Sequence, residues 1–535
     1  MDFETLNEMK APDGDQGAPL GMVTRDRPQY LAQGAWAVLE NCNIADPTII
    51  QKRKGKRIAH WGGGTPTYLN KIGYPIQACC EWTKSGVPRI VVAYYNTSTA
   101  KSIIAEWVDG AQWATINNTL TFGTGDVTLL TANSKLWVVW GSDIHSWDGT
   151  TFVDESNDDN TSAPNGRYAI IHGGRMWIWG KSNDPSRIWW SDIWDHGATA
   201  WNRLTDFLEP TQDTQDPIVG AISGRSGELF VFTRRSIWVV GTQGPVTDWA
   251  MARIENSIGC SARNTIRQVG ADVYFQDSAG QVRSLQRTIS DAAQGVKQFP
   301  QSDNIFPSLD TLPRTGLAKA SAVWFEDRYI LATSGGGGVN NQLWVCETRR
   351  IAWSSHTKWV FSHLLISRVR TSEGDRLWGF SYDGDLFMLH EGRYDEVRNG
   401  GGTPTSSFIE TRERSRGYSC GTMLNNKLFA EAELSGVVTN DIGAASSVLL
   451  LASVDDGAFL PMTFGGFQVA GRTFFPLTFP LSFFAGVLLR AKLHLESLGK
   501  GRHCQMEVQF TTDVSDFQFR EAVIMGLLDN YDQEA

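Results

Sequence analysis

The sequence lacks the features of an exported or membrane-spanning protein. No run of 18 apolar residues occurs, which excludes a transmembrane helix of ordinary length. The start of the chain is acidic and polar, so we expect no secretory signal there. There are seven cysteines, and none belongs to a Cys-x-x-Cys motif. We therefore expect free thiols and a chain that folds in a reducing cytoplasm.

Positive charge is also in deficit. Lys and Arg number 48 against 58 Asp and Glu, which gives a net charge of −10. This balance excludes a uniformly basic nucleic-acid clamp, but it allows a local basic patch or a channel lined with negative charge. The most basic stretch supports two interpretations: a solvated turn, or an electrostatic contact with an acidic partner protein or with DNA phosphates. Its five candidate partner-binding residues are Lys52, Arg53, Lys54, Lys56 and Arg57.

Catalytic and metal-binding signatures are missing as well. The nine histidines form no His-Glu-x-x-His motif, and the chain has no Gly-x-Ser-x-Gly, phosphate loop or dinucleotide fingerprint. A partial Asp box, 453–457, lacks the Thr-Trp ending of sialidase repeats. We therefore predict no catalytic residue, no metal and no cofactor, and a protein that is not an enzyme. The many carboxylates leave a glycosidase pair open.

The chain is rich in glycine and tryptophan, with 53 and 21 residues. Glycine favours turns, and tryptophan favours half-buried pleated surfaces, so the two together indicate many short strands joined by tight turns. A pattern of one polar residue followed by alternating apolar and aromatic residues recurs through the middle of the chain. Its instances begin at Arg89, Lys135, Arg175, Glu228, Asp272, Arg328 and Arg376. The mean spacing of about 48 residues is typical of a β-propeller blade.

Most instances are followed by a short polar turn and a second apolar strand, which indicates hairpins. We predict an all-β protein with a propeller of about six blades, and a count of seven remains open. The predicted domains are an N-terminal arm or platform segment (1–70), the propeller (71–400) and a C-terminal β-sandwich (401–535). A Gly/Pro/Ser-rich linker at 399–407 separates the last two. Packing of the N-terminal segment with the sandwich is an alternative that the sequence leaves open.

Four groups of residues carry a resemblance to a known family. The first group is Gly21–Asp26, Leu39–Cys42 and Ile50–Gly55. The second is Arg187–Asp192 with Trp201-Asn202, and the third is Glu228–Thr233 with Ser236–Trp238 and Gly241. The fourth is Ile258–Cys260, Val269-Gly270, Asp272–Phe275 and Gly280–Leu285. These groups, the last three also in their order and spacing, resemble the tail nozzle (tail tube or DNA-stabilising) proteins of short-tailed bacteriophages.

This resemblance implies a structural subunit of a homo-hexameric ring. In the family, the ring lies below the portal and the adaptor ring, continues and closes the channel for phage genomic DNA, and docks tail fibre or needle proteins. We therefore expect a virion protein of the phage tail that is assembled in the host cytoplasm. The family has no catalytic residues to carry over. A net negative charge agrees with a conduit through which DNA slides, because a basic lining would grip the phosphates.

Two other functions remain as alternatives. One is a propeller-based phage tail protein that binds or cleaves glycans, which requires convergent carboxylates and stacked aromatic residues at the centre of the propeller. The other is a cytoplasmic propeller scaffold of a cell. The scarcity of Trp-Asp dipeptides at the expected blade ends counts against the scaffold.

Overall fold

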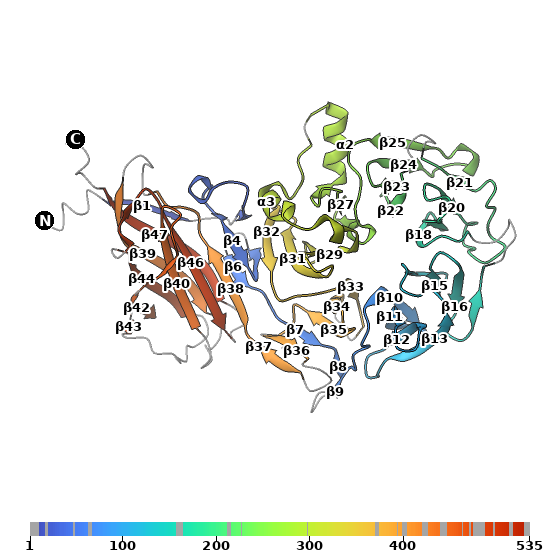
Figure 1. Cartoon of the computed structure of the whole chain (residues 1–535), viewed down its shortest axis with the longest axis horizontal. Coiled ribbons are helices and arrows are strands. Elements are labelled where there is room, and N and C mark those ends of the chain that lie inside the picture. The colour runs from blue at the N-terminus through green and yellow to red at the C-terminus, as the bar shows by residue number, and fades with distance from the viewer. Residues whose placement is uncertain are drawn as a thin grey trace.

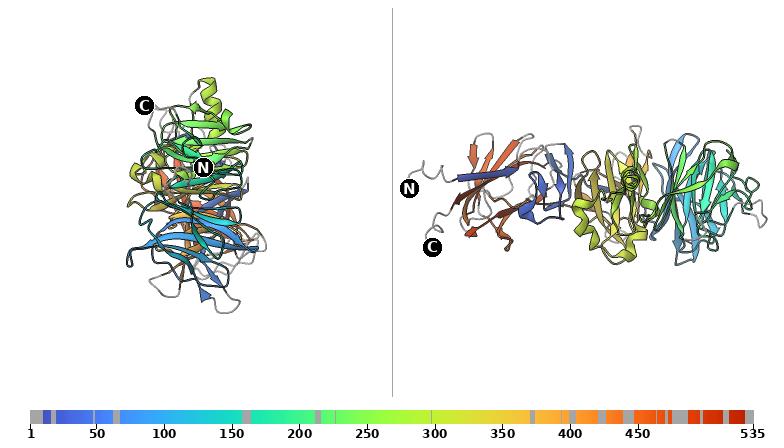
Figure 2. Two further views of the ribbon diagram at one scale, coloured as in Figure 1. Left: turned by 90° about the vertical axis from the view of Figure 1, so that its right-hand side faces the viewer. Right: turned by 90° about the horizontal axis from the view of Figure 1, so that it is seen from above.

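The computed structural model shows an elongated molecule with a ring of small sheets at one end and a group of longer strands at the other (Figures 1 and 2). The description excludes residues 1–9, 16–19, 47–48, 62–66, 157–163, 211–215, 226, 297, 370–373, 393, 399–403, 420–425, 439–446, 463, 470–471, 475–486, 496–497, 513–516 and 529–535. Most of the proposed linker and the acidic C-terminal end therefore lie outside the described residues.

The ring is a β-propeller, as predicted. Six of its blades have four antiparallel strands each, and two of these blades extend into larger sheets. The first four of them follow one another along the chain. They are β10 (Ile76–Lys84), β11 (Val87–Asn96), β12 (Lys101–Trp107) and β13 (Ala114–Leu120); β14 (Thr128–Ala132), β15 (Lys135–Val139), β16 (Ile144–Trp147) and β17 (Phe152–Asp154); β18 (Tyr168–His172), β19 (Arg175–Trp179), β20 (Ile188–Trp190) and β21 (Phe207–Leu208); and β22 (Ile218–Ser223), β23 (Glu228–Thr233), β24 (Ile237–Gly241) and β25 (Met251–Glu255).

A smaller sheet follows these four blades. It contains β26 (Arg267–Val269), β27 (Asp272–Gln276) and β28 (Val282–Ser284), and helix α2 (Leu285–Gln294) begins directly after β28, where a fourth strand would otherwise stand. The side chain of Ser284 caps this helix by accepting a hydrogen bond from the backbone N–H of Arg287 at 3.0 Å. A capped helix start thus ends the run of strands and leaves this sheet one strand short.

The remaining two blades complete the circle. One contains β29 (Ser321–Phe325), β30 (Arg328–Ser334), β31 (Asn340–Glu347) and β32 (Ala352–His356), and the last contains β33 (His363–Ser367), β34 (Arg376–Phe380), β35 (Leu386–Leu389) and β7 (Lys56–Ile58). The innermost strands of neighbouring blades contact one another, η3 (Arg263–Thr265) bridges β22 and β29 beside the smaller sheet, and β33 contacts β10. The propeller thus has six four-stranded blades, and the smaller sheet brings the number of sheets around the axis to seven, the count that the sequence left open.

The sequence repeat marks the second strand of every sheet. Strands β15, β19, β23, β27, β30 and β34 begin at the first residue of a predicted instance, and β11 begins two residues before Arg89. Tight turns before several of these strands use residues at positive φ, such as Asn133 and Ser134 before β15 and Glu326 and Asp327 before β30. Such turns match the twist of a hairpin, so the strand and its inner neighbour form one local unit.

Tryptophans link neighbouring blades. The rings of Trp82 in the first blade and Trp147 in the second lie 4.7 Å apart between centroids. Trp107 of the first blade and Trp378 of the last form an edge-to-face pair at 5.4 Å. These side chains are largely buried between sheets. Large aromatic rings between twisted sheets supply much of the apolar area that holds adjacent blades together, which explains the high tryptophan content.

The last blade takes its outermost strand from the N-terminal part of the chain. Strand β7 pairs antiparallel with β35, with Ile58 opposite Phe387 and Lys56 opposite Leu389. Strand β36 (Asp395–Val397) then pairs with β7, and β37 (Thr405–Ser407) pairs with β36. Residues far apart in sequence therefore close the ring.

Beyond the propeller, strands from both ends of the chain form the terminal module, which we define as β1, β4–β6 and β38–β47. One of its two sheets continues a blade outward: β32 pairs with β4 (Val38–Glu40), and the order continues through β38 (Ile409–Arg414), β46 (Cys504–Thr512), β40 (Ser447–Val454) and β41 (Leu460–Pro461). The blade and the terminal module thus share one nine-stranded sheet.

The other sheet of the terminal module has a central path with two strands to the side. The path is β43 (Arg472–Phe474), β42 (Phe464–Val469), β44 (Val487–His494), β39 (Lys427–Val438), β47 (Phe517–Leu528), β6 (Ile49–Lys52) and β5 (Cys42–Asp46), while β1 (Lys10–Asp15) pairs with β47 and β45 (Lys500–Gly501) with β39. Two short pairs complete the strands: β2 (Gly21–Met22) with β3 (Ala35–Trp36), and β8 (His60–Trp61) with β9 (Thr67–Tyr68).

Besides α2, the described residues contain short helices only. They are η1 (Pro28–Tyr30), η2 (Val246–Asp248), η3 (Arg263–Thr265), η4 (Asp303–Ile305), α3 (Phe306–Asp310) and η5 (Arg314–Lys319). The predicted domain limits at 70 and 400 remain predictions, as does the C-terminal sandwich. Strand pairing crosses both limits, because residues of the 1–70 segment pair with the last blade and with strands after 401.

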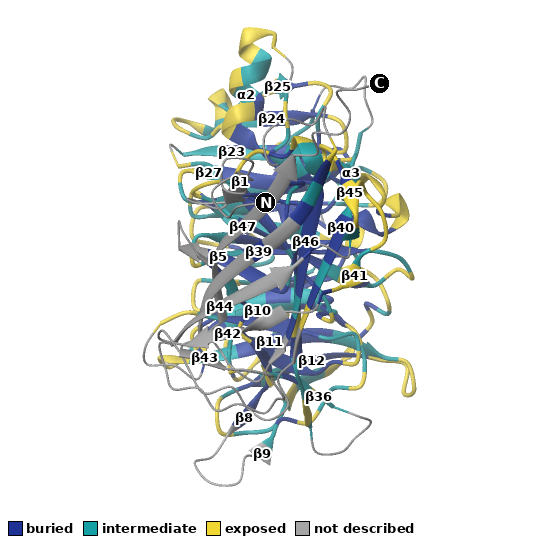
Figure 3. Cartoon of the chain, turned by 90° about the vertical axis from the view of Figure 1, so that its left-hand side faces the viewer, coloured by how far each residue is buried: buried dark blue, intermediate teal, exposed yellow. Residues whose placement is uncertain are grey.

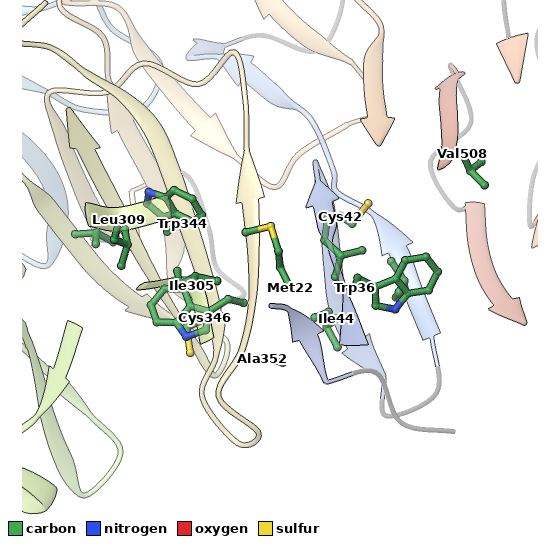
Figure 4. Packing of buried hydrophobic residues seen from close by; sticks show 14 of the residues in the cluster. Met22, Trp36, Cys42, Ile44, Ile305, Leu309, Trp344, Cys346, Ala352 and Val508 are labelled. Atoms are coloured by element: carbon green, nitrogen blue, oxygen red, sulfur yellow. The ribbon is translucent and has the colours of Figure 1, made fainter. Parts of the chain in front are cut away.

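One buried cluster joins the propeller to the terminal module (Figure 4). It brings together Met22 and Ile44 from the N-terminal part, Leu309 from α3, Trp344 from β31 and Val508 from β46. In Figure 3, viewed from the end that carries both termini, β46 is buried over most of its described length. Because a single apolar core runs through the junction, the two parts form one packed body rather than two bodies on a linker.

Candidate functional site

The basic stretch singled out by the sequence lies at this junction, and its most buried member is Arg53. The Arg53 guanidinium forms a two-pronged ion pair with Asp395, with Nη1–Oδ1 and Nη2–Oδ2 distances of 2.9 and 2.6 Å. The exposed side-chain fractions are 0% and 3%. Trp359 lies under the guanidinium at 4.3 Å and donates its Nε1–H to Asp395 at 3.0 Å. Arg53 is therefore fully engaged inside the protein.

Asn41 connects this ion pair to three parts of the chain. Its Oδ1 accepts a 2.8 Å hydrogen bond from Arg53 Nε, and its Nδ2 donates to Thr357 Oγ1 and to the carbonyl of Glu410, both at 2.7 Å. The residue has a φ of 59°, a region in which asparagine is among the more tolerant side chains. Asn41 and Arg53 belong to the N-terminal stretches that resemble the nozzle family, and the structure uses both to hold the junction together.

Lys56 is also buried. Its Nζ donates to the carbonyl of Lys358 at 3.2 Å and lies 4.8 Å from the centroid of the Phe387 ring. Burial lowers the pKa of this amine to about 8, although the Asp395 carboxylate acts in the opposite direction. An ammonium that packs on aromatic rings inside the last blade cannot serve as an exposed contact.

The prediction of a partner-binding surface is therefore wrong for Lys52, Arg53 and Lys56, which are buried in the chain itself. Of the five candidates, Lys54 and Arg57 are exposed. Arg57 lies 3.7 Å from Glu396, so Lys54 is the more available of the two. The sequence could not reveal this burial, because Asp395 lies 342 residues from Arg53.

A second candidate site is the axis of the propeller, whose lining residues the sequence did not indicate. A cavity of about 840 Å³ opens on the face where the inner strands begin. A further cavity of about 410 Å³ continues along the axis. Gln77, Arg263, Asn264 and His363 line both. Inner strands of different blades thus converge on one polar space, a common position for a binding site.

The side chain of Arg263 spans this axis. It starts from η3, beside the smaller sheet, and reaches the second blade, where Nη1 donates to Thr128 Oγ1 at 2.7 Å and Nη2 donates to the carbonyl of Val127 at 3.0 Å. On the way it stacks on Tyr168 of the third blade, with the guanidinium carbon 4.3 Å from the ring centroid. The propeller axis is therefore crossed by a side chain and is not an open tube.

Arg267 and His363 lie deeper in the same space. Arg267 donates from Nε to the carbonyl of Ala322 at 2.6 Å. Burial lowers the pKa of Arg267. Burial, together with the two nearby arginines, lowers the pKa of His363 to about 4, so this imidazole is neutral at pH 7. A neutral, buried histidine beside arginines is a poor general base.

Asp126 is the single carboxylate that lines either cavity within the described residues. It accepts a 2.6 Å hydrogen bond from Tyr168 Oη, and burial together with this carboxylate raises the pKa of Tyr168 to about 12. Glycoside hydrolysis usually requires two carboxyl groups, one acting as acid and one as nucleophile or base. Arginine side chains therefore dominate the charge of the axial space, which gives it a lining suited to anions.

The cysteines offer no reactive thiol in this region. Six of the seven lie in described residues, and none of the six forms a disulfide. The seventh, Cys420, lies outside those residues. Burial raises the pKa of Cys79, beside the axial space, to about 12, and the pKa of Cys260 equally. These thiols remain protonated and behave as small apolar side chains.

Fold and site together define a β-propeller whose ring is closed by an N-terminal strand and whose axis is basic. No protein-family model matches the chain. No curated protein matches it either.

Among solved structures, the chain is similar to a streptogramin B lyase, with 9% identity, a TM-score of 0.36 and coverage of 62% of this chain and 97% of the lyase chain. It is also similar to a virginiamycin B lyase from Staphylococcus aureus (9% identity, TM-score 0.37, 62% and 99% covered). A third is the Pan2 WD40 domain from Neurospora crassa (10% identity, TM-score 0.37, 64% and 95% covered). These likenesses concern the fold alone. Among the described residues, no helix is long and apolar enough to cross a membrane.

Proposed function

We propose that this chain is a structural subunit of a phage tail nozzle, which forms a ring below the portal and adaptor and continues the DNA channel. The observation that carries the proposal is the position of the first group of family-like residues. Met22, Asn41, Cys42 and Arg53 all lie at the junction, where they unite the propeller and the terminal module. Such a junction suits a ring subunit that guides DNA, because a force on the propeller is transmitted to the terminal module.

The blocked propeller axis indicates where the DNA channel of the proposed ring lies. Arg263 crosses the propeller, so DNA cannot pass through a single subunit. In the proposed ring, the channel runs between copies of the chain, along surfaces that the excess of negative charge keeps from gripping phosphates. The subunit contributes walls and docking surfaces and performs no chemistry. The axial space, with one carboxylate, does not favour the glycan-cleaving alternative.

The test is the oligomeric state of the purified full-length chain. Native mass spectrometry and negative-stain images are recorded with and without the adaptor protein. A six-fold ring, formed by the chain alone or on the adaptor, is the expected result. A monomer or trimer that ignores the adaptor overturns the proposal, and hydrolysis of host surface polysaccharide by the isolated chain overturns it in favour of the glycan-directed alternative.

A further inference from the structure

The larger axial cavity carries a strong local excess of positive charge. Its lining includes five cationic side chains, from Arg167, Lys181, Arg234, Arg263 and Lys319, against the one carboxylate of Asp126. The whole chain has the opposite balance, at −10. Positive charge gathered in a concave space attracts anions more strongly than the same charge on a convex surface, because the low-dielectric walls focus the field.

Most of these cations have no carboxylate partner. Within the described part of the chain, Lys181 alone among the five forms an ion pair, with Asp184 at 3.3 Å. The Arg263 side chain donates to a hydroxyl and a carbonyl, and the Arg267 side chain, which lines the deeper cavity, donates to backbone carbonyls only. Burial lowers the pKa of both guanidinium groups. A charge in such a place costs free energy unless an opposite charge accompanies it.

The unused N–H donors of Arg263 also favour an anionic ligand. A guanidinium has five N–H donors, and the Arg263 side chain makes two hydrogen bonds with described residues. Its planar fork matches the oxygens of phosphate and carboxylate groups. His363 is neutral at the same place, so it leaves the charge balance of the lining unchanged. The single Asp126 carboxylate leaves most of the positive charge of the lining unbalanced.

We propose that the axial cavity binds a small ligand that carries several phosphate or carboxylate oxygens. Arg263 contacts it from below, Arg167 and Arg234 contact it at the rim, and Arg267 adds positive charge from the deeper cavity. A volume of about 840 Å³ lies within the range of small-molecule sites, so the ligand is a compact oxyanion rather than a nucleic-acid duplex. This site is separate from ring assembly and does not depend on the proposed function.

The experiment is isothermal titration of the full-length chain, at low ionic strength, with sodium pyrophosphate and with sodium citrate. The two probes distinguish phosphate from carboxylate ligands. We expect one site per chain for at least one probe and weaker binding as salt is added. Arg167→Gln and Arg234→Gln, whose side chains make no hydrogen bond or ion pair with described residues, should each lower the affinity about tenfold.

Arg235→Gln is the matched control, because Arg235 is exposed, adjoins Arg234 and does not line the cavity. The affinity of this variant for the probe should equal that of the unmodified chain. Arg263→Gln should abolish binding, and circular dichroism checks its fold. If that variant unfolds, the two rim variants still decide the question. The proposal is overturned if neither probe gives a heat of binding at millimolar concentrations. It is also overturned if the rim variants bind the probe as tightly as the control variant does.

Discussion

Arg53 and Asp395 show how much of this molecule depends on side chains that water does not reach. Two opposite charges with 0% and 3% exposure are costly to bury, and their geometry has to be nearly ideal to offset that cost. Here both guanidinium prongs, Asn41 and Trp359 contribute. Removing one partner leaves the other charge buried without compensation.

We predict that Asp395→Asn lowers the free energy of unfolding by about 3 kcal/mol or more, because Arg53 then stays buried without a counter-charge. Urea unfolding followed by circular dichroism measures the change. The control is Asp310→Asn, which breaks the Arg314–Asp310 pair at 3.2 Å, whose side chains are 63% and 48% exposed. That change should cost less than about 1 kcal/mol. Equal losses in the free energy of unfolding for the two substitutions would show that the Arg53–Asp395 pair contributes no more to stability than an exposed pair.

Glu413 makes stability depend on pH. This carboxyl of β38 is buried, its Oε1 accepts a hydrogen bond from Cys42 Sγ at 3.4 Å, and its Oε2 has no partner among the described residues. Burial raises the pKa of Glu413 to about 7. Between about pH 4.5 and 7 the folded chain therefore binds more protons than the unfolded chain, and stability falls as the pH rises through this window.

Glu413→Gln should remove this loss. Compared with the unmodified chain, we expect the variant to gain stability at pH 8 by up to about 3 kcal/mol and to show little difference near pH 5. Urea unfolding at pH 5, 6, 7 and 8 gives the comparison. Glu410→Gln on the same strand is the control, because Glu410 is exposed and pairs with Lys358 at the surface. Parallel pH profiles for Glu413→Gln and the unmodified chain would contradict the prediction.

At the scale of elements, the sequence repeat predicted more than a fold class. It located the first residue of six second strands, because a polar residue after a tight turn and an alternating apolar run are both local signals. It did not predict the three-stranded sheet, where a capped helix follows β28, nor that β7 supplies the last blade. A strand of three residues with two basic side chains has no local signature, and its pairing with β35 depends on residues more than 300 positions away.

Gly55, just before β7, has a packing reason to be glycine. Its φ is not positive, but a Cβ added there would lie 1.8 Å from the carbonyl oxygen of Tyr394, which is backbone and cannot rotate away. The Gly55 N–H also donates to the carbonyl of Gly392 at 3.0 Å. The glycine within the basic stretch thus lets two segments of backbone approach closely as the ring closes.

We predict that Gly55→Ala lowers the free energy of unfolding by about 2 kcal/mol or more, because the backbone of the last blade must move. Gly241→Ala is the control, since Gly241 has no positive φ and no atom within 4 Å of an added Cβ. Its effect should stay within about 0.5 kcal/mol. Thermal unfolding of both variants gives the comparison, and a Gly55→Ala melting temperature equal to that of the control would be incompatible with this close approach.

At the scale of the whole molecule, the N-terminal residues are part of both bodies and not an appendage. Strand β4 connects β32 to β38, and β7 completes the last blade. The sequence predicted the propeller and its period, but it gave no means of finding the axial arginines. Arg263 acquires its role only when the ring brings Thr128 and Tyr168 opposite it, and that arrangement is a property of closure rather than of any segment.

We predict that a chain lacking residues 1–58 fails to form a soluble, cooperatively unfolding protein, because it loses both β4 and β7. A chain lacking residues 1–20 retains both strands and loses β1, which pairs with β47. This control should remain soluble, with a β-rich circular dichroism spectrum and a lower melting temperature. Size-exclusion chromatography and thermal unfolding separate the two cases. A monodisperse 59–535 chain that melts cooperatively would show that the ring closes without its N-terminal strand.

The pairing of β7 with β35 also means that β7 is synthesised well before its partner strand. About 330 residues separate Ile58 from Phe387, so at roughly 5–20 residues per second the ribosome needs about 15–65 s to deliver the partner strand. During that interval β7 is already outside the exit tunnel and its backbone edges are unpaired. Unpaired strand edges favour pairing with other nascent chains. Lysine and arginine occupy two of the three positions of β7, and charged side chains on an open strand edge oppose such pairing.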